Sequence, residues 1–184
     1  MKQVKKFQVD VLKHWQKNGR HTLPWRLTND PYRILVSEVM LQQTQVDRVI
    51  PYFEKFLKKF PTVQKLAKAK LGDVLKLWSG LGYNRRAKYL HDAGRAIVER
   101  HGGKFPRDYT ELRKLPGVGD YTARAVRVFA FNEPDILIET NIRTVFFHHA
   151  EVFHVACGRK RHGTLQRGEK RRCGCWFQLK CLVR

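Results

Sequence analysis

The sequence has few acidic residues, no long apolar run and no cysteine before residue 157. Its 184 residues hold 16 Asp and Glu against 37 Lys and Arg, which gives a formal net charge of +21. No stretch approaches the roughly 18 uncharged apolar residues that a membrane-spanning helix needs, so a membrane protein is excluded. Residues 1–10 are basic and lack the apolar core and cleavage site of a secretory signal, so none is expected.

The cysteines are confined to the last 28 residues, at positions 157, 173, 175 and 181. The rest of the chain therefore has no disulfide framework, and a reducing, cytoplasmic setting of the bacterial or archaeal type is expected. The length argues for one domain, and a hydrophobic content of 42% is enough for an ordinary core. A charge of +21 exceeds what solubility requires and indicates a polyanionic partner, with nucleic acid the first candidate.

The charge divides the chain into two parts. Residues 155–184 hold nine basic residues and one acidic residue, a net +8, while residues 1–154 carry the remaining +13. Helical periodicity stops at the same point, and Gly, Arg and Cys follow with few apolar residues. We therefore expect a domain over 1–154 and a poorly ordered basic tail over 155–184.

Residues 1–154 carry the signals of an all-α fold. Asp30 followed by Pro31 is typical of a helix start, with apolar residues continuing to Leu41. Thr44 is predicted to cap the next helix, which Pro51 should kink. Further helices are expected over 71–78 and 85–101, each followed by a pair of glycines. No run shows convincing alternation with a period of two.

The most informative local signal is the segment Leu115-Pro116-Gly117-Val118-Gly119-Asp120, which lies between two helical patterns. Two glycines allow a tight hairpin over about 115–120 that can approach another molecule closely. A helix that begins directly after it directs its N–H groups and positive dipole end outward. On a basic chain this predicts a site for DNA phosphate, formed by Gly117, Val118 and Gly119.

Six strings in order over residues 23–143 resemble the adenine DNA glycosylase (MutY) branch of the helix-hairpin-helix DNA glycosylases. They are Leu23-Pro24-Trp25-Arg26, Asp30-Pro31-Tyr32, the ten residues from Ser37 to Val46, Gly80-Leu81-Gly82-Tyr83 with Arg86-Ala87, the six residues from His101 to Pro106, and the hairpin. The resemblance implies the all-α glycosylase fold. The helices with which the family continues after Arg143 are absent, so we expect a fold that is incomplete at its C-terminal end.

Two carboxylates are implicated in chemistry. Removal of a purine from deoxyribose needs an acid for the leaving base and a negative charge for the oxocarbenium-like sugar. Glu38, in an otherwise apolar stretch, is the candidate acid, and burial would keep it protonated. The resemblance places the second carboxylate at Glu139, where the family has Asp. Either the backbone compensates for the extra methylene, which Asn141 and Arg143 favour, or the sugar cation is poorly stabilised.

The remaining site residues come from the resemblance. Tyr121 stands where bifunctional relatives carry the Schiff-base Lys, which implies a monofunctional hydrolase, and Asn141 completes the catalytic set. The target base must leave the duplex, and filler side chains lower that cost. Gln43 and Tyr83 are the candidates to fill the gap, with Thr44 beside them. The resemblance assigns the base pocket to Trp25 and Arg26.

The family's 4Fe-4S cluster is not expected in this chain, because the cysteine spacing differs from C-x6-C-x2-C-x5-C. The gaps here are fifteen, one and five residues, and a cluster needs all its thiolates in register. Zinc is not expected either, since Cys173 and Cys175 are one residue too close for the common spacing. No metal or cofactor is therefore predicted.

The sequence thus predicts a monomeric DNA glycosylase of base excision repair. Its substrate would be duplex DNA with adenine mispaired with guanine or 8-oxoguanine, although the domain that reads the oxidised guanine in the family is missing. Two alternatives stay open: a thymine glycosylase for G·T mispairs on the same fold, and a DNA-binding protein that is catalytically weak or inactive. The tail could be a frame slip, a remnant of a longer chain or a basic DNA-binding arm.

Overall fold

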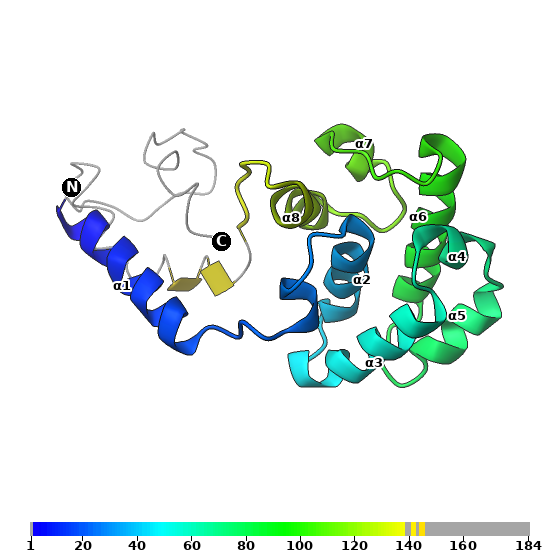
Figure 1. The fold of residues 1–184 in the computed structure, drawn as a ribbon, viewed down its shortest axis with the longest axis horizontal. Helices are drawn as coiled ribbons and strands as arrows, with labels where there is room; N and C mark the ends of the chain where they lie inside the picture. The colour runs from blue at the N-terminus through cyan, green and yellow to red at the C-terminus, as the bar shows by residue number, and fades with distance from the viewer. Residues whose placement is uncertain (1, 139–140, 143, 146–184) are drawn as a thin grey trace, which may run out of the picture. The chain divides into compact units, whose positions relative to one another are not determined.

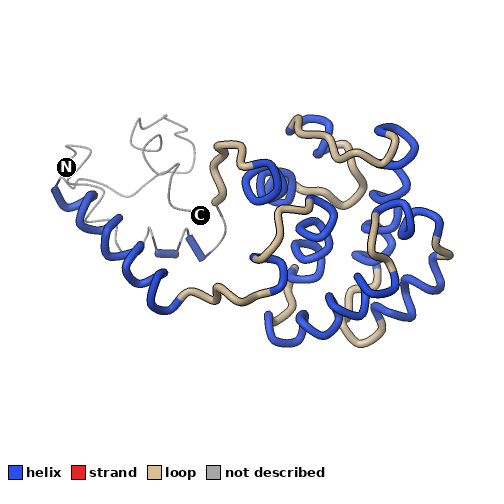
Figure 2. The backbone as a smooth tube through the Cα atoms, viewed as in Figure 1, coloured by secondary structure: helices blue, strands red, loops and turns tan. Residues whose placement is uncertain are grey.

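Helices form every regular element of the residues that the structure, a computed structural model, describes: 2–138, 141–142 and 144–145 (Figures 1 and 2). The all-α prediction is confirmed for these residues. In chain order the elements are α1 (Lys2–Asn18), the 3-10 helix η1 (Pro24–Arg26), α2 (Pro31–Leu41), α3 (Val46–Lys59), α4 (Val63–Lys68), α5 (Leu71–Trp78), α6 (Arg85–His101), α7 (Tyr109–Arg113) and α8 (Asp120–Phe131).

The chain divides into two units. One is His21–Leu137, and the other combines Met1–Arg20 with Ile138–Arg184. In the second unit α1 carries exposed apolar side chains at Val9, Val11, Leu12 and Trp15. Residues 141–142 and 144–145 are helical. The predicted boundary at residue 155 lies outside the described residues and stays a prediction.

Helix α2 is the central element of the unit His21–Leu137, and it packs against α3, α6 and α8. Seven of its eleven residues are buried, which explains why its apolar residues are not confined to one face. Asp30 caps it as predicted, since the carboxylate accepts a hydrogen bond of 2.9 Å from the Tyr32 N–H and Pro31 occupies the first turn. The buried Tyr32 hydroxyl donates to the Phe60 carbonyl at 2.7 Å, which joins the start of α2 to the end of α3.

The core of this unit continues from α2 into α3, α5 and α6. Helix α6 packs against both α4 and α5, and α3 packs against α5. The largest fully buried side chains come from these helices and from α7 and α8: Ile34, Val36, Met40, Val49, Phe56, Leu66, Val74, Trp78, Leu90, Ile97, Leu112 and Val126. Helices α2 and α8 are therefore held in place by packing in this core.

Three features differ from the sequence prediction. Thr44 does not cap α3, because Gln45 occupies the N-cap position, without a side-chain bond; Pro51 lies inside α3, and the predicted kink there stays a prediction. Helix α4 was not expected, because its six residues are too few to show a period and its start depends on the Thr62 side chain. Helix α1 was not expected either. Its sequence is basic, but it contains neither Gly nor Pro to interrupt a helix.

Among the described residues, no helix is long and apolar enough to cross a membrane.

Candidate functional site

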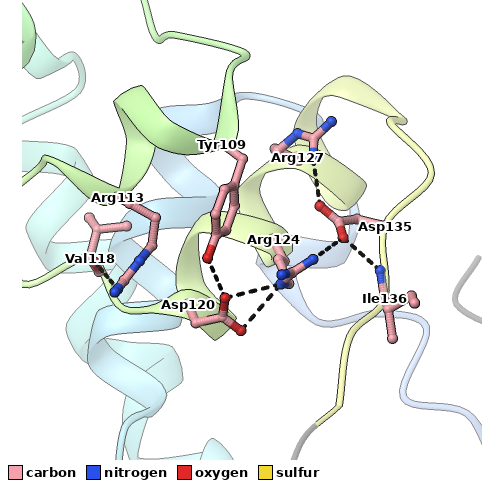
Figure 3. Close-up of polar contacts among 8 residues, drawn as sticks. All are labelled: Tyr109, Arg113, Val118, Asp120, Arg124, Arg127, Asp135 and Ile136. Atoms are coloured by element: carbon pink, nitrogen blue, oxygen red, sulfur yellow. Dashed lines mark hydrogen bonds and ion pairs between the residues drawn. The ribbon is translucent and has the colours of Figure 1, made fainter. Parts of the chain in front are cut away.

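The predicted hairpin joins α7 to α8, and contacts within the protein hold its conformation. Gly117 has φ +72°, a left-handed conformation, and a Cβ added there would lie 2.6 Å from the Tyr89 Cβ. Leu115 and Val118 are buried, and the Val118 N–H donates to the Leu115 carbonyl at 3.1 Å. Arg113 donates to the Val118 carbonyl at 3.0 Å (Figure 3). The turn is therefore set before any ligand arrives.

The three hairpin residues predicted to bind phosphate differ in what they present. Val118 has a buried side chain, and both of its backbone groups make hydrogen bonds within the protein, so it holds the turn; its contact with phosphate stays a prediction. Gly119 is exposed at the N-cap of α8, and a Cβ added there would meet no atom within 4 Å. Backbone N–H groups in the first turn of a helix have no acceptor within that helix. Gly119 thus leaves the backbone at the start of α8 open to close approach, while Gly117 allows the turn to pack against Tyr89.

Asp120 places a negative charge in the first turn of α8. Its carboxylate accepts a hydrogen bond from the Tyr109 hydroxyl, and Arg124 Nε lies 3.2 Å from both of its oxygens (Figure 3). These contacts, the Tyr109 bond first, hold the pKa of Asp120 below its usual range. The carboxylate therefore stays ionised, and Arg124 offsets its charge beside the predicted phosphate site.

A second ion-pair group ties the segment after α8 back to that helix. Asp135, whose side chain is 7% exposed, binds Arg124 with one oxygen and Arg127 with the other at 2.6 Å (Figure 3). Asn132 ends α8 in a left-handed conformation, and Leu137 is buried. The path of residues 132–137 is therefore fixed from α8.

Glu38 lies on α2 among buried residues. It is half-buried, while Ser37 and Val39 are 1% and 4% exposed. Helix α2 packs against α8, which carries Tyr121. Tyr121 is 37% exposed in the first turn of α8. The structure thus brings together the helix of the predicted acid and the helix of the predicted site tyrosine.

The predicted wedge residues lie on two separate loops. Gln43, in the loop from α2 to α3, and Tyr83, in the loop from α5 to α6, are both exposed, and both have positive φ, +55° and +51°. Arg86, in the first turn of α6, is 9% exposed and donates hydrogen bonds to both loops. Burial lowers the pKa of Arg86 from its ordinary value. Sequence reasoning did not single out this residue, and its place beside Ala87 in a matching string was the one available signal.

The two predicted base-pocket residues belong to η1. Trp25 is half-buried, and its ring meets Phe53 of α3 edge to face with centroids 5.4 Å apart. Arg26 is exposed. The pocket role of both residues stays a prediction, since the contact shown for Trp25 is with the core.

Three predictions fall outside this unit. Asn141 is an exposed residue of a helical stretch in the other unit. Glu139 and the four cysteines lie outside the described residues, so their roles stay predictions. Among the residues that the structure describes, no group of three or more His, Cys, Asp or Glu side chains could hold a metal ion.

The chain is similar in sequence to curated adenine DNA glycosylases. The adenine DNA glycosylase of Buchnera aphidicola subsp. Baizongia pistaciae is 40% identical over 146 residues, which are 79% of this chain and 42% of that protein. The protein of the same name from Homo sapiens is 42% identical over 140 residues, 71% of this chain and 26% of that protein. The chain thus spans about two fifths, or less, of the length of these curated relatives.

Solved structures confirm the predicted glycosylase fold. A thermostable thymine-DNA glycosylase superposes with a TM-score of 0.74 at 29% identity, covering 84% of this chain and 77% of that one. Endonuclease III in a non-covalent DNA complex superposes with a TM-score of 0.69 at 24% identity, and the match covers 79% of this chain and 66% of that one. The model of the HhH-GPD superfamily base excision DNA repair proteins matches residues 36–155, which include Glu38, both loops and the hairpin. The chain belongs to this superfamily.

Proposed function

We propose that this protein is a monofunctional DNA glycosylase that hydrolyses the N-glycosidic bond of adenine mispaired with guanine or 8-oxoguanine. One observation carries the proposal: relatives named adenine DNA glycosylase, from bacteria to mammals, are 40–43% identical over at least 70% of this chain. The segment over residues 36–155 that matches the superfamily model contains the half-buried Glu38, the two exposed loops and the hairpin. The whole reaction is a proposal because the chain spans less than half of each of these relatives.

The described residues support the steps that precede chemistry. The start of α8 would hold a backbone phosphate of duplex DNA through its N–H groups and dipole. Gln43 and Tyr83 would enter the duplex and fill the gap left by the extruded base, with Thr44 beside them. Trp25 and Arg26 would line the pocket for that base.

Chemistry would follow in the pocket. Glu38 would donate a proton to the leaving base, which weakens the glycosidic bond. Glu139 would stabilise the positive charge that develops on the sugar, and water would complete the hydrolysis, with Asn141 in the catalytic set. Tyr121 has no amine that could form a Schiff base, so no covalent enzyme–DNA intermediate and no strand cleavage would result.

A second candidate function is removal of thymine from a G·T mispair. The thymine-DNA glycosylase named above covers 84% of this chain with a TM-score of 0.74, which supports this reaction on the same fold. The third candidate is a DNA-binding protein that has lost catalysis through Glu139 or the residues after 154. Both alternatives retain DNA as the partner.

We propose that the reaction requires no metal cluster. The cysteine spacing does not match four ligands in register, so no step is assigned to such a group. Iron and sulfide analysis of the purified protein tests this, and stoichiometric iron would contradict it. The proposal also implies a monomer that acts on the chromosome in the cytoplasm.

A single-turnover assay on defined duplexes tests the proposed function. The full chain is mixed with duplexes that contain A·G, A·8-oxoguanine, G·T or fully paired DNA, and base release is measured. We expect the native protein to release adenine from the A·G and A·8-oxoguanine duplexes. Glu38→Gln should lower the rate of release on the order of a thousandfold, which is what a general acid typically contributes. Borohydride should trap no covalent complex. Release of thymine alone would favour the second candidate, and no release from any duplex would leave the binding protein.

A further inference from the structure

The loops that carry Gln43 and Tyr83 share an unusual backbone feature. Both residues have a side chain and yet adopt positive φ, +55° and +51°. This conformation is uncommon for residues other than glycine and costs about 1–3 kcal/mol. It persists only where surrounding contacts hold it. Some group of the protein must therefore fix the two loops.

Arg86 is that group, because one guanidinium reaches both loops. Its Nη1 donates to the carbonyls at the end of α2, Val39 and Met40 at 3.1 Å each, and also to the Gln42 carbonyl. Its Nη2 donates to the Thr44 hydroxyl oxygen and to the Gly82 carbonyl, both at 3.1 Å. The residues directly before and after Gln43, and the residue directly before Tyr83, are thus held by a single side chain.

The same guanidinium also contacts the Tyr83 side chain. The Arg86 Cζ lies 5.4 Å from the centroid of the Tyr83 ring, within the range of a cation–π contact. The buried Arg86 Nε has no hydrogen-bond partner among the described residues. Burying a donor without a partner costs free energy. The hydrogen bonds that Nη1 and Nη2 make to both loops offset the cost of burying Nε without a partner.

We propose that Arg86 is a positioning residue for base extrusion. This inference rests on the proposed function. Arg86 holds Gln43 and Tyr83 in the conformation in which both enter the duplex, so that neither loop has to be ordered when DNA binds. Ordering a loop costs free energy, so replacing Arg86 would reduce the fraction of DNA in which the target base is extruded. The rate of base release would fall with that fraction. Arg86 touches neither the base nor the sugar in this role.

The test compares Arg86→Gln and Arg86→Lys with Arg95→Gln in the full chain. Arg95 lies on the same helix, is exposed and pairs with Glu99 at 3.4 Å, so its replacement removes the same charge without touching either loop. Two quantities are measured: the single-turnover rate of adenine release, and the fluorescence of 2-aminopurine placed at the target position, which rises when that base leaves the stack. A thermal melt accompanies each variant.

We expect Arg86→Gln to lower the rate roughly a hundredfold, which is the typical cost of misplaced reacting groups. It should also remove most of the fluorescence rise. Arg86→Lys should lose about tenfold, since an ammonium keeps the charge but lacks the planar fork that reaches both loops. Arg95→Gln should stay within about twofold. A rate and fluorescence rise in Arg86→Gln equal to those of Arg95→Gln would overturn the proposal.

A double-mutant cycle separates positioning from general support of the fold. In a background with Gln43→Ala and Tyr83→Ala, Arg86→Gln should cost less than about threefold, because the residues it positions are gone. An undiminished cost in that background would overturn the proposal. If Arg86→Gln does not fold, Arg86→Lys serves in its place. It should lower the rate about tenfold in the native background and leave it nearly unchanged in the double-Ala background.

The fluorescence measurement keeps the inference separate from the proposed function. A native protein that releases no base from any mispair contradicts the proposed function. The rise of 2-aminopurine fluorescence reports extrusion without bond cleavage, so its loss in Arg86→Gln would still support the positioning role. A native protein that releases adenine while Arg86→Gln keeps the full fluorescence rise contradicts the positioning role alone.

Discussion

Arg127 donates a hydrogen bond of 2.6 Å to Asp135, whose side chain is 7% exposed. Arg124 binds the other oxygen of the same carboxylate, so two consecutive turns of α8 hold the first residues after the helix (Figure 3). Glu139 follows Asp135 by four residues in the sequence. The chain that leads to Glu139, the second predicted carboxylate, thus starts from Asp135, which two ion pairs hold against α8.

Asp135→Asn should destabilise the protein by about 2 kcal/mol, because two guanidinium groups lose their charged acceptor in a partly buried place. We expect the single-turnover rate to fall about tenfold as well, since the chain toward Glu139 loses its anchor. Urea unfolding and the base-release assay measure the two effects. Asp92→Asn is the control: it breaks the exposed pair with Lys88 at 2.7 Å and should cost less than about 0.5 kcal/mol. Equal losses in the two variants would contradict the anchoring role.

The two hairpin glycines should respond differently to a methyl group. Gly117→Ala should cost about 2 kcal/mol, since φ is +72° there and the new Cβ would lie 2.6 Å from the Tyr89 Cβ. Gly119→Ala meets no atom of the protein within 4 Å and should leave the melting temperature nearly unchanged. If the backbone at Gly119 approaches a phosphate, the same variant should bind DNA about tenfold more weakly. Unchanged affinity in Gly119→Ala would contradict a close phosphate contact at this residue.

Asp120 should contribute stability that depends on pH. Its pKa is lowered in the folded protein, so the contribution is present above the unfolded value of about 3.9 and is lost as the pH falls through the lower folded value. The side chain is 61% exposed, so the effect should be small, below about 1 kcal/mol. Native protein and Asp120→Asn should therefore differ slightly in urea unfolding at pH 7, and the difference should shrink as the pH falls below about 3.9.

The same variant should bind DNA more tightly, because a negative charge beside the predicted phosphate is removed. We expect roughly threefold higher affinity at low salt and a smaller difference at high salt. Titration of a labelled duplex at two salt concentrations measures this. Weaker binding by Asp120→Asn would show that the carboxylate orders the hairpin rather than repelling the phosphate.

Glu139→Asp tests whether the backbone is matched to the longer side chain. Removal of one methylene moves the carboxylate by about 1 Å, so in a matched site the rate should fall on the order of a hundredfold with unchanged DNA affinity. Glu99→Asp, on the exposed face of α6, serves as the control and should have no effect. A faster Glu139→Asp would show instead that the native carboxylate stabilises the sugar cation poorly.

Local chemistry in the sequence determined much of this protein. Asp30 and Pro31 predict the start of α2, and the glycines after residues 78 and 101 predict the ends of α5 and α6, because caps and turns depend on adjacent residues. The hairpin glycines and the string around Glu38 indicated the glycosylase fold, which the superfamily match and the solved structures confirm.

The tertiary structure decided what contacts between distant segments control. Thr44 looks like a helix cap in the sequence, and in the fold its hydroxyl accepts from Arg86, 42 residues away. The sequence predicts a phosphate contact at Val118, and the fold adds that its side chain is buried and that its carbonyl accepts a hydrogen bond from Arg113. The string that contains Arg86 and Ala87 gave no hint of this role, since the role arises where the end of α2 meets the start of α6. Local rules predict where a helix begins, but only packing brings one guanidinium to two loops.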